Sequence, residues 1–206
     1  MKSLFNILLI GLGLSCITRN NFGQTITSDK FDIKKFDSEK IYNKQSTVLE
    51  VNDTLKDSTT IKRYEYSDGY IEIIQVLNSP IKITKSYFKN TGNIKTISKE
   101  FSGCPIGFWN AYNENGKLVK QTNWDKNYSF SVYDLAEKFK KEFDIDIMHT
   151  NLPLYAIVSR GYDKFSYYEV SISRLCMCDS RVIRVDGNSG KILSERIQPY
   201  LDGEHY

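Results

Sequence analysis

The sequence predicts an α+β protein built mainly of antiparallel β-hairpins. From residue 61 onward, short runs rich in β-branched and aromatic residues alternate with turn residues, as in a meander of strands. One clear helical period follows, over residues 131–143. Tyrosine is frequent, with 14 residues, and proline is rare, with 4, a composition that favours strands. We therefore expect hairpin repeats followed by a unit made of a helix and an antiparallel sheet.

The first residues have the pattern of an export signal. Lys2 supplies a positive charge before an apolar run over residues 4–14. This run is too short to span a bilayer and has the length of the apolar region of a signal peptide. No later segment is long and apolar enough for a membrane span. We therefore expect an exported protein that is periplasmic, attached to the outer membrane or secreted.

Two cleavage positions are open. Cleavage before Cys16 follows a degenerate lipobox and predicts a signal of residues 1–15, with a lipid on Cys16 as a membrane tether. Cleavage after Gly23 predicts a signal peptide of residues 1–23 and a soluble chain.

Residues 24–60 form a polar segment. Its apolar positions keep no long period, so we expect an irregular or edge segment. These positions are Phe31, Ile33, Phe36 and Ile41.

Residues 61–127 contain the strand-like runs of the expected hairpin array. The runs cover residues 61–66, 70–77, 81–88, 93–98, 108–112 and 117–124. Between them lie turn sequences that contain Gly or Asn, which adopt the positive φ of a tight turn at low cost. The turns are Ser-Asp-Gly at 67–69, Asn-Ser-Pro at 78–80, Asn-Thr-Gly at 90–92 and Glu-Asn-Gly at 114–116.

An internal repeat runs through this region. Gly69, Gly92 and Gly116 follow one another at spacings of 23 and 24 residues, and residues 88–94 align with residues 112–118. Repeats of this length stack, because a single hairpin cannot bury its own apolar face.

Residues 107–118, GFWNAYNENGKL, resemble the G-x-W-x-x-Y-x-x-N-G-x-L unit of MORN-repeat-variant proteins, the YwqK-type family labelled as antitoxins. The resemblance implies an array of β-hairpins and no catalytic residue. Its structural residues have two roles, with glycines at turns and aromatic side chains packed between hairpins. They are Gly92, Gly107 and Gly116, with Trp109 and Tyr112.

Residues 128–206 form the expected helix-plus-sheet unit. Apolar residues follow a helical period from Val132 to Phe143, and Ser131 with Asp134 forms a capping box. Strand-like runs follow at residues 155–160, 166–175, 181–186 and 191–197.

The turn between the last two runs resembles that of PepSY-like domains of bacterial envelope proteins. It reads V-D-G-x-S-G-K-I-L over residues 185–193, with Asp186, Gly187 and Gly190 as its turn residues. The resemblance implies a PepSY-like α+β unit. Together with the expected signal and hairpins, this order of segments resembles envelope proteins of Bacteroidota-type bacteria.

The cysteines leave several possibilities open. Beyond Cys16, the chain contains Cys104, Cys176 and Cys178, an odd number for an oxidising compartment. A disulfide from Cys104 to one of the other two would join the hairpin array to the last unit. Alternatively, the thiols stay packed or free, or one of them forms an intermolecular bond. The two thiols of the C-x-C sequence could also hold Cu(I) or form a redox pair, and Cys104 could act as a nucleophile with His149.

The sequence contains no glycine-rich phosphate loop, nucleophile elbow, H-E-x-x-H or C-x-x-C motif, so we expect no catalytic residue, cofactor or metal. The net charge of +3 gives no basic excess for nucleic acid.

The leading expectation is a non-catalytic exported binding protein that holds a protein, glycan or lipid on the face of its hairpin array. The family label implies an immunity-type version of this function. The alternatives are a PepSY-like regulator or inhibitor of an envelope peptidase and a thiol-dependent envelope enzyme.

Overall fold

The computed structural model describes residues 18–19, 25–26, 29–149, 154–174 and 179–199. Residues 1–17 and 20–23 of the expected signal peptide lie outside the described residues, as do Cys176 and Cys178. Cys16 belongs to the first of these ranges. A short pair of antiparallel strands, β1 (Thr18–Arg19) and β2 (Thr25–Ile26), precedes the main fold.

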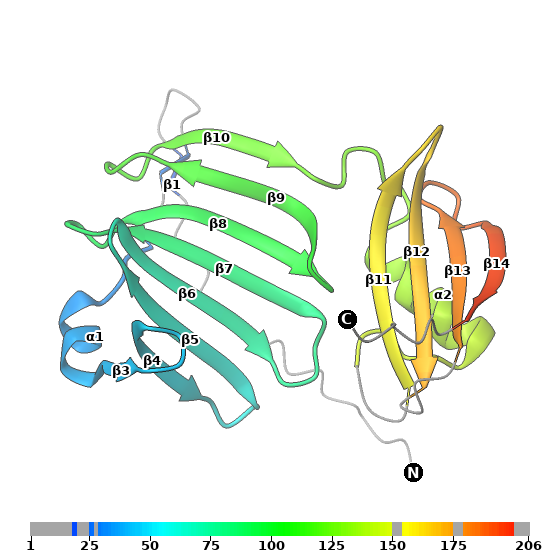
Figure 1. Cartoon of the computed structure of the whole chain (residues 1–206). Coiled ribbons are helices and arrows are strands. Elements are labelled where there is room, and N and C mark those ends of the chain that lie inside the picture. The colour runs from blue at the N-terminus through cyan, green and yellow to red at the C-terminus, as the bar shows by residue number, and fades with distance from the viewer. Residues whose placement is uncertain (1–17, 20–24, 27–28, 150–153, 175–178, 200–206) are drawn as a thin grey trace, which may run out of the picture.

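An eight-stranded sheet forms most of the molecule (Figure 1). Its strands follow one another in sequence order and pair antiparallel, so that the sheet is one continuous meander. They are β3 (Ile41–Asn43), β4 (Val48–Thr54), β5 (Thr59–Tyr66), β6 (Gly69–Val76), β7 (Ile81–Phe88), β8 (Ile94–Phe101), β9 (Cys104–Tyr112) and β10 (Leu118–Asn123). The antiparallel arrangement predicted from the sequence is confirmed.

A second, four-stranded meander follows helix α2 (Val132–Phe143), which covers one of its faces (Figure 1). Its strands are β11 (Leu154–Tyr162), β12 (Ser166–Arg174), β13 (Ser180–Asp186) and β14 (Ile192–Gln198). Leu135 and Phe139 of the helix are fully buried against Tyr168, Val170 and Ile183 of the sheet. At this coarse level the α+β class is confirmed.

Helix α2 begins at the predicted capping box. The Ser131 Oγ accepts a hydrogen bond from the Asp134 backbone N–H at 3.2 Å, and the Asp134 carboxylate accepts one from the Ser131 backbone N–H at 2.8 Å. The Ser131 hydroxyl also donates to the Asp134 carboxylate at 2.7 Å, and this bond, followed by that from the Ser131 backbone N–H, lowers the pKa of Asp134 because both stabilise its charged form. The helix ends at Asp144, which adopts a left-handed conformation with φ of 54°.

Of the two alternatives for residues 24–60, the edge segment agrees with the structure and the irregular segment does not. The structure places helix α1 (Ile33–Glu39) and strands β3 and β4 there, at one edge of the large sheet. The Asp32 side chain caps α1 by accepting from the Lys35 backbone N–H at 3.0 Å. A helix of this length shows almost no period in sequence, and packing stabilises it, because Phe36 is 2% exposed.

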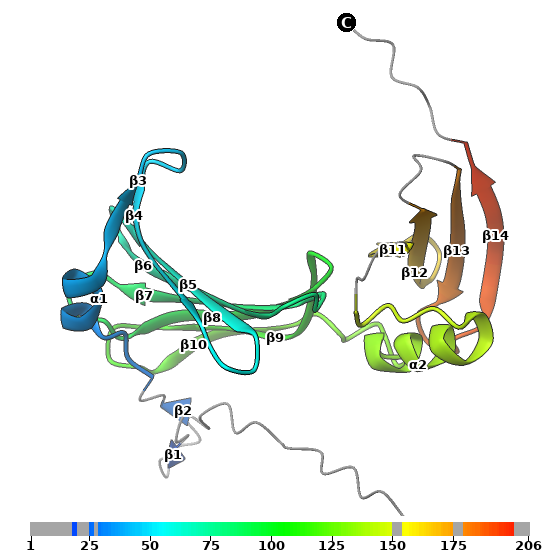
Figure 2. The ribbon, with the colours of Figure 1, turned by 90° about the horizontal axis from the view of Figure 1, so that it is seen from below.

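The eight-stranded sheet is curved, with α1 outside the curve and the four-stranded sheet beyond the opposite end (Figure 2). Phe36 of α1 packs with Phe31, Tyr70 and Tyr87, which identifies their side of the sheet as the convex face. Phe31 stacks on Tyr70 with 4.5 Å between ring centroids.

The predicted turn glycines are required for different structural reasons. Gly92 and Gly116 have positive φ, of 68° and 74°, as the turns require. Gly69 does not have positive φ; a Cβ there would lie 2.0 Å from the Tyr87 carbonyl oxygen, so close backbone approach requires the glycine.

The two aligned turns also differ in their hydrogen bonds. The Gly92 N–H donates to the Phe88 carbonyl, four residues before it, whereas the Gly116 N–H donates to the Asn113 carbonyl, three residues before it. Both turns close hairpins at the same end of the sheet. The repeat as a stacking unit stays a prediction.

Arg160 of β11 connects the two sheets. Its side chain is 8% exposed, donates to the Pro105 carbonyl of β9 at 2.8 Å and lies 2.7 Å from the Asp125 carboxylate after β10. It also donates to the Tyr168 hydroxyl at 3.2 Å. Phe101 and Ile106 of the large sheet belong to the same apolar cluster as α2, so the two sheets share a core.

Candidate functional site

The concave face of the large sheet carries two rows of side chains that cross the strands. Residues opposite each other in the register lie on the same face, so the strand pairs define each row. The first row is Glu50, Tyr64, Ile71, Ser86, Thr96, Ala111 and Lys120. The second is Lys62, Ile73, Thr84 and Ser98, continued across the β9 bulge by Trp109 and Thr122. We call these two rows the concave face.

The centre of the concave face is uncharged. On β6 to β9 the side chains of the two rows are hydroxyl, aliphatic or indole groups, and none is ionisable. They are Ile71, Ile73, Thr84, Ser86, Thr96, Ser98, Trp109 and Ala111. The next pair on the same side of the sheet, Lys82 and Glu100, is an ion pair of 2.8 Å. The convex face of the same strands carries alternating charges, among them Glu72, Lys85 and Lys99. The two faces of the sheet therefore differ in charge, and they also differ in that α1 packs only on the convex one.

Only some of the hydroxyl groups of the concave face form hydrogen bonds within the protein. Ser86 and Thr96 hydrogen-bond to each other at 2.6 Å, and the Ser98 hydroxyl donates to the Thr84 carbonyl at 3.4 Å. Within the part of the chain that the structure describes, the Thr84 and Thr122 hydroxyls have no hydrogen-bond partner in the protein. These groups remain able to bind a ligand or water.

Trp109 forms one side of a shallow pocket of about 240 Å³ on this face. Thr96, Ser98, Ala111 and Thr122 are among the other residues that line it. The indole N–H donates to the Lys99 carbonyl at 3.2 Å, which fixes the ring on β8. Trp124 packs against Trp109 edge to face, with 5.2 Å between ring centroids.

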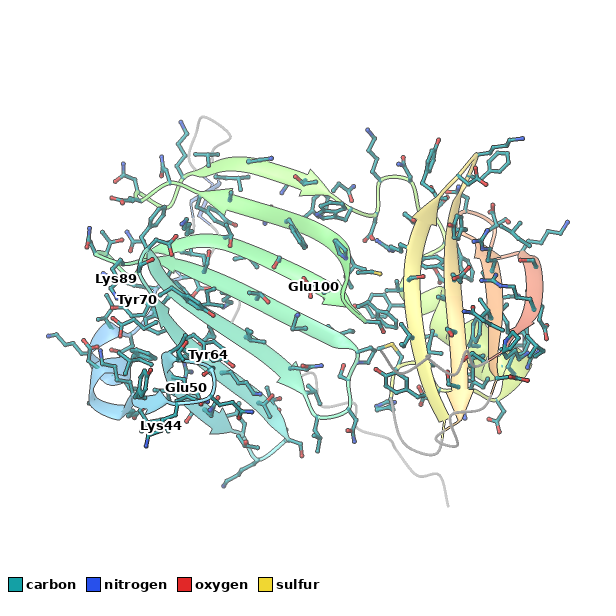
Figure 3. The ribbon with its side chains drawn as sticks, in the orientation of Figure 1. Lys44, Glu50, Tyr64, Tyr70, Lys89 and Glu100 are labelled. Atoms are coloured by element: carbon teal, nitrogen blue, oxygen red, sulfur yellow. The ribbon has the colours of Figure 1, made fainter. Side chains whose placement is uncertain are left out.

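One end of the concave face is shaped by the β3–β4 hairpin. Glu50, 7% exposed, accepts hydrogen bonds from the side-chain amides of Asn43 and Asn52, both at 2.9 Å. Tyr64 lies beside Glu50 in the register (Figure 3), and burial, followed by the Glu50 charge, raises the pKa of its hydroxyl. Glu100 lies on the strand that leads toward the four-stranded sheet (Figure 3).

The convex face, in contrast, is closed by α1 and by ion pairs. Arg63 lies between Asp53 and Glu72, at 2.5 and 2.9 Å, and the Tyr87 hydroxyl donates to Glu72 at 3.3 Å. Burial is the main cause that raises the pKa of Tyr87. A cavity of about 180 Å³ lies under α1 among these groups. Because Asp29, Arg63 and Glu72 in its lining are already in ion pairs, we assign the cavity a structural role.

A groove of about 410 Å³ continues the concave side toward the four-stranded sheet. It lies between the turns after β6 and β8 and strand β11, and Gln75, Pro80 and Lys82 form part of its wall. Tyr155 and Ile157 of β11 line its other side and are 50% and 45% exposed.

The predicted repeat residues of β9 are divided between the two faces. Tyr112 is 7% exposed in the convex cluster, whereas Trp109 lies on the concave face. A spacing of three residues in a strand points side chains to opposite faces, a signal that the sequence already contained. Gly107 has φ of 64° at a bulge in β9, and its N–H donates to the Asp125 carboxylate at 2.8 Å.

The predicted turn at the end of β13 has a structural role. The Asp186 carboxylate accepts from the backbone N–H groups of Asn188 and Ser189, which lowers its pKa. The Gly187 carbonyl accepts from the Phe130 N–H at 3.0 Å, and Gly190 packs against the Phe130 ring with φ of 70°. The turn thereby holds the segment that leads into α2.

Cys104 is a half-buried free thiol within the described residues, and it donates to the Val158 carbonyl at 3.6 Å. Its predicted disulfide partners, Cys176 and Cys178, lie outside those residues, so the disulfide stays a prediction. The His149 ring pairs with Asp146 at 3.0 Å.

Sequence reasoning identified Trp109 but missed the rows of hydroxyls around it. Each of Thr84, Ser98 and Thr122 is an ordinary strand residue in its own segment. Only the cross-strand register brings them together.

Within the described ranges, no group of acidic, histidine or cysteine side chains is arranged to hold a metal ion. Neither of the two helices found there has the length and apolar character needed to cross a membrane. No protein-family profile matches the chain, and no curated protein or solved structure is significantly similar to it.

Proposed function

We propose that this protein is a non-catalytic, exported binding protein of the bacterial envelope that holds its ligand on the concave face. The observation that carries the proposal is the contrast between the two faces of one sheet. Helix α1 and paired charges cover the convex face, while the concave face presents Trp109, Tyr64 and hydroxyls that have no partner among the described residues. A surface with aromatic anchors among small polar groups is typical of recognition sites.

The proposal is tested with a photo-crosslinking amino acid placed on either face. Ser98 lies on the concave face, and Phe108, 53% exposed, lies on the convex face of neighbouring strand β9. We expect a crosslinked adduct in the cell envelope from position 98 and none from position 108. Equal labelling from both positions, or none from position 98, would contradict the proposal.

The alternative, regulation of an envelope peptidase by the PepSY-like unit, is favoured by one observation. Tyr155 and Ile157 expose apolar surface on β11, at the inter-sheet groove. A crosslinker at Ile157 that captures a peptidase, while position 98 captures nothing, would support this alternative. The immunity-type version instead requires a toxin protein crosslinked from position 98.

The thiol-dependent enzyme has no such support. The Cys104 thiol donates to a backbone carbonyl, and His149 pairs with Asp146. Neither contact couples the two side chains.

A further inference from the structure

We infer that the ligand of the concave face is an uncharged oligosaccharide that lies across the strands, with Trp109 as its stacking platform. The inference rests on the proposed function and adds the chemical class of the ligand. It follows from three features of the concave face: its mixture of groups, its spacing and the lack of unpaired cations at its centre.

The mixture of groups matches a pyranose ring. Such a ring presents C–H groups on its faces and hydroxyls around its edge, so it needs a flat apolar surface beside hydrogen-bonding groups. Trp109 supplies an aromatic surface, and Thr84 and Thr122 supply hydroxyls without a partner in the described protein. A hydroxyl both donates and accepts hydrogen bonds, as the hydroxyls of a sugar do.

The spacing favours a chain over a single sugar. Each row crosses successive strands, from β5 to β10, and neighbouring strands lie about 4.8 Å apart. That distance is close to the length of one sugar unit in an extended oligosaccharide. Successive strands can therefore contact successive sugars, and the pocket at Trp109 would hold one of them.

The lack of unpaired cations at the centre disfavours the polyanionic ligands. The two rows carry no ionisable side chain on β6 to β9, and Glu50 at one end is satisfied by two asparagines. A phosphate-bearing lipid, a nucleic acid or an acidic polysaccharide would need cations beneath it. Lys62 and Lys120 lie at the margins of the rows. Beside the rows, on the same side of β7 and β8, Lys82 and Glu100 neutralise each other in an ion pair of 2.8 Å.

Binding can be followed by tryptophan fluorescence, because Trp109 and Trp124 are the only two tryptophans in the sequence. In a Trp124→Phe variant, Trp109 is the sole reporter. The full processed protein is titrated with cellohexaose, xylohexaose, mannohexaose and maltohexaose. We expect at least one of them to change the Trp109 emission with saturation, and the corresponding disaccharide to bind more weakly.

Substitutions then locate the site by calorimetry. Trp109→Ala is expected to weaken binding by about tenfold or more, and Trp109→Phe to restore part of it. Thr84→Lys places a charge at the centre of the face and is expected to abolish binding. Phe108→Ala, an exposed aromatic on the other face of the same strand, is the matched control and should bind as the unchanged protein does.

The inference is wrong if none of the four hexaoses binds, or if Trp109→Ala and Thr84→Lys, shown to be folded by circular dichroism, bind as well as Phe108→Ala. A protein crosslinked from position 98, with no hexaose bound, would overturn the oligosaccharide and leave the proposed function intact. Failure of both experiments would overturn both proposals.

Discussion

The two sheets of this protein are stabilised in different ways. The four-stranded sheet is one layer of a two-layer sandwich, with α2 packed over a continuous apolar core. The eight-stranded sheet has a smaller aromatic cluster, confined to the convex side near α1, and its opposite face has no cover in the described residues. The four-stranded sheet therefore gains its stability mainly from buried apolar area. The eight-stranded sheet relies more on cross-strand side-chain pairs, and this leaves one of its faces free for a ligand.

The largest expected effect tests the core itself. Phe139→Ala removes a fully buried ring between α2 and the four-stranded sheet and should lower the free energy of unfolding by about 3–5 kcal/mol. Ile73→Ala, a half-buried side chain on the concave face, should cost only about 1 kcal/mol. Urea unfolding of both variants measures the difference. An equal loss of unfolding free energy in both variants would contradict the difference between the two sheets, because it would mean that the concave face is also part of a buried core.

The second test addresses the connection between the sheets. Arg160→Met leaves the Asp125 carboxylate and the Pro105 carbonyl without their cation, and should cost about 2 kcal/mol. We expect the thermal unfolding of this variant to broaden, as the two sheets lose their coupling. Arg196→Met, at a half-exposed ion pair on β14, is the control and should change the free energy of unfolding by about 0.5 kcal/mol or less.

A smaller effect is expected under α1. Tyr87→Phe removes a buried hydroxyl that donates to Glu72, with a loss of about 1 kcal/mol in urea unfolding. Tyr42→Phe, at an exposed position on the edge strand β3, is the matched control and should unfold as the unchanged protein does. If the two variants behave alike, the polar layer under α1 does not stabilise the convex face.

The smallest effect depends on pH. Lys89 and then Lys40 lower the pKa of Glu65 against the opposing effect of burial. A lowered folded-state pKa stabilises the protein above the unfolded-state pKa, near 4.3, and this stabilisation disappears as the pH falls through the folded-state value. Glu65→Gln should therefore cost about 0.5 kcal/mol at pH 7 and nothing at acidic pH.

Urea unfolding at pH 7 and pH 3 checks this difference. Glu195→Gln is the control, since Glu195 is paired with Arg181 at an exposed edge and should show a weaker dependence on pH. A constant difference between Glu65→Gln and the unchanged protein at both pH values would show that the Glu65 charge is not what stabilises this region.

The sequence predicted local structure well where local physics decides it. The Ser131–Asp134 capping box defined the start of α2, because both groups of the box lie within one helical turn. Gly92 and Gly116 identified hairpin turns through their need for positive φ. Helix α1 was missed, since its stability comes from Phe36 packing on a strand that lies far along the chain.

The concave face could be predicted only in part. The sequence identified Trp109 as a residue of the repeat-like unit but did not predict which face of the sheet it lies on. Both Trp109 and Tyr112 were expected to pack between hairpins, and the structure places them on opposite faces. The hydroxyl of Thr84 lies beside that of Ser98 only through pairing of β7 with β8. No sequence pattern within a single strand predicts such a row, because its members come from different strands.

By itself, the sequence determined the strand-like segments from residue 61 onward, most of their turns and the position of the longer helix, because period, capping and backbone φ act over a few residues. Only the tertiary structure decided which face of the large sheet is covered. A period of two residues divides a strand into two faces but does not say which one is buried. Segment 29–39 decides this, because its Phe31 and Phe36 pack on the convex side and leave Trp109 and the hydroxyl rows on the open one.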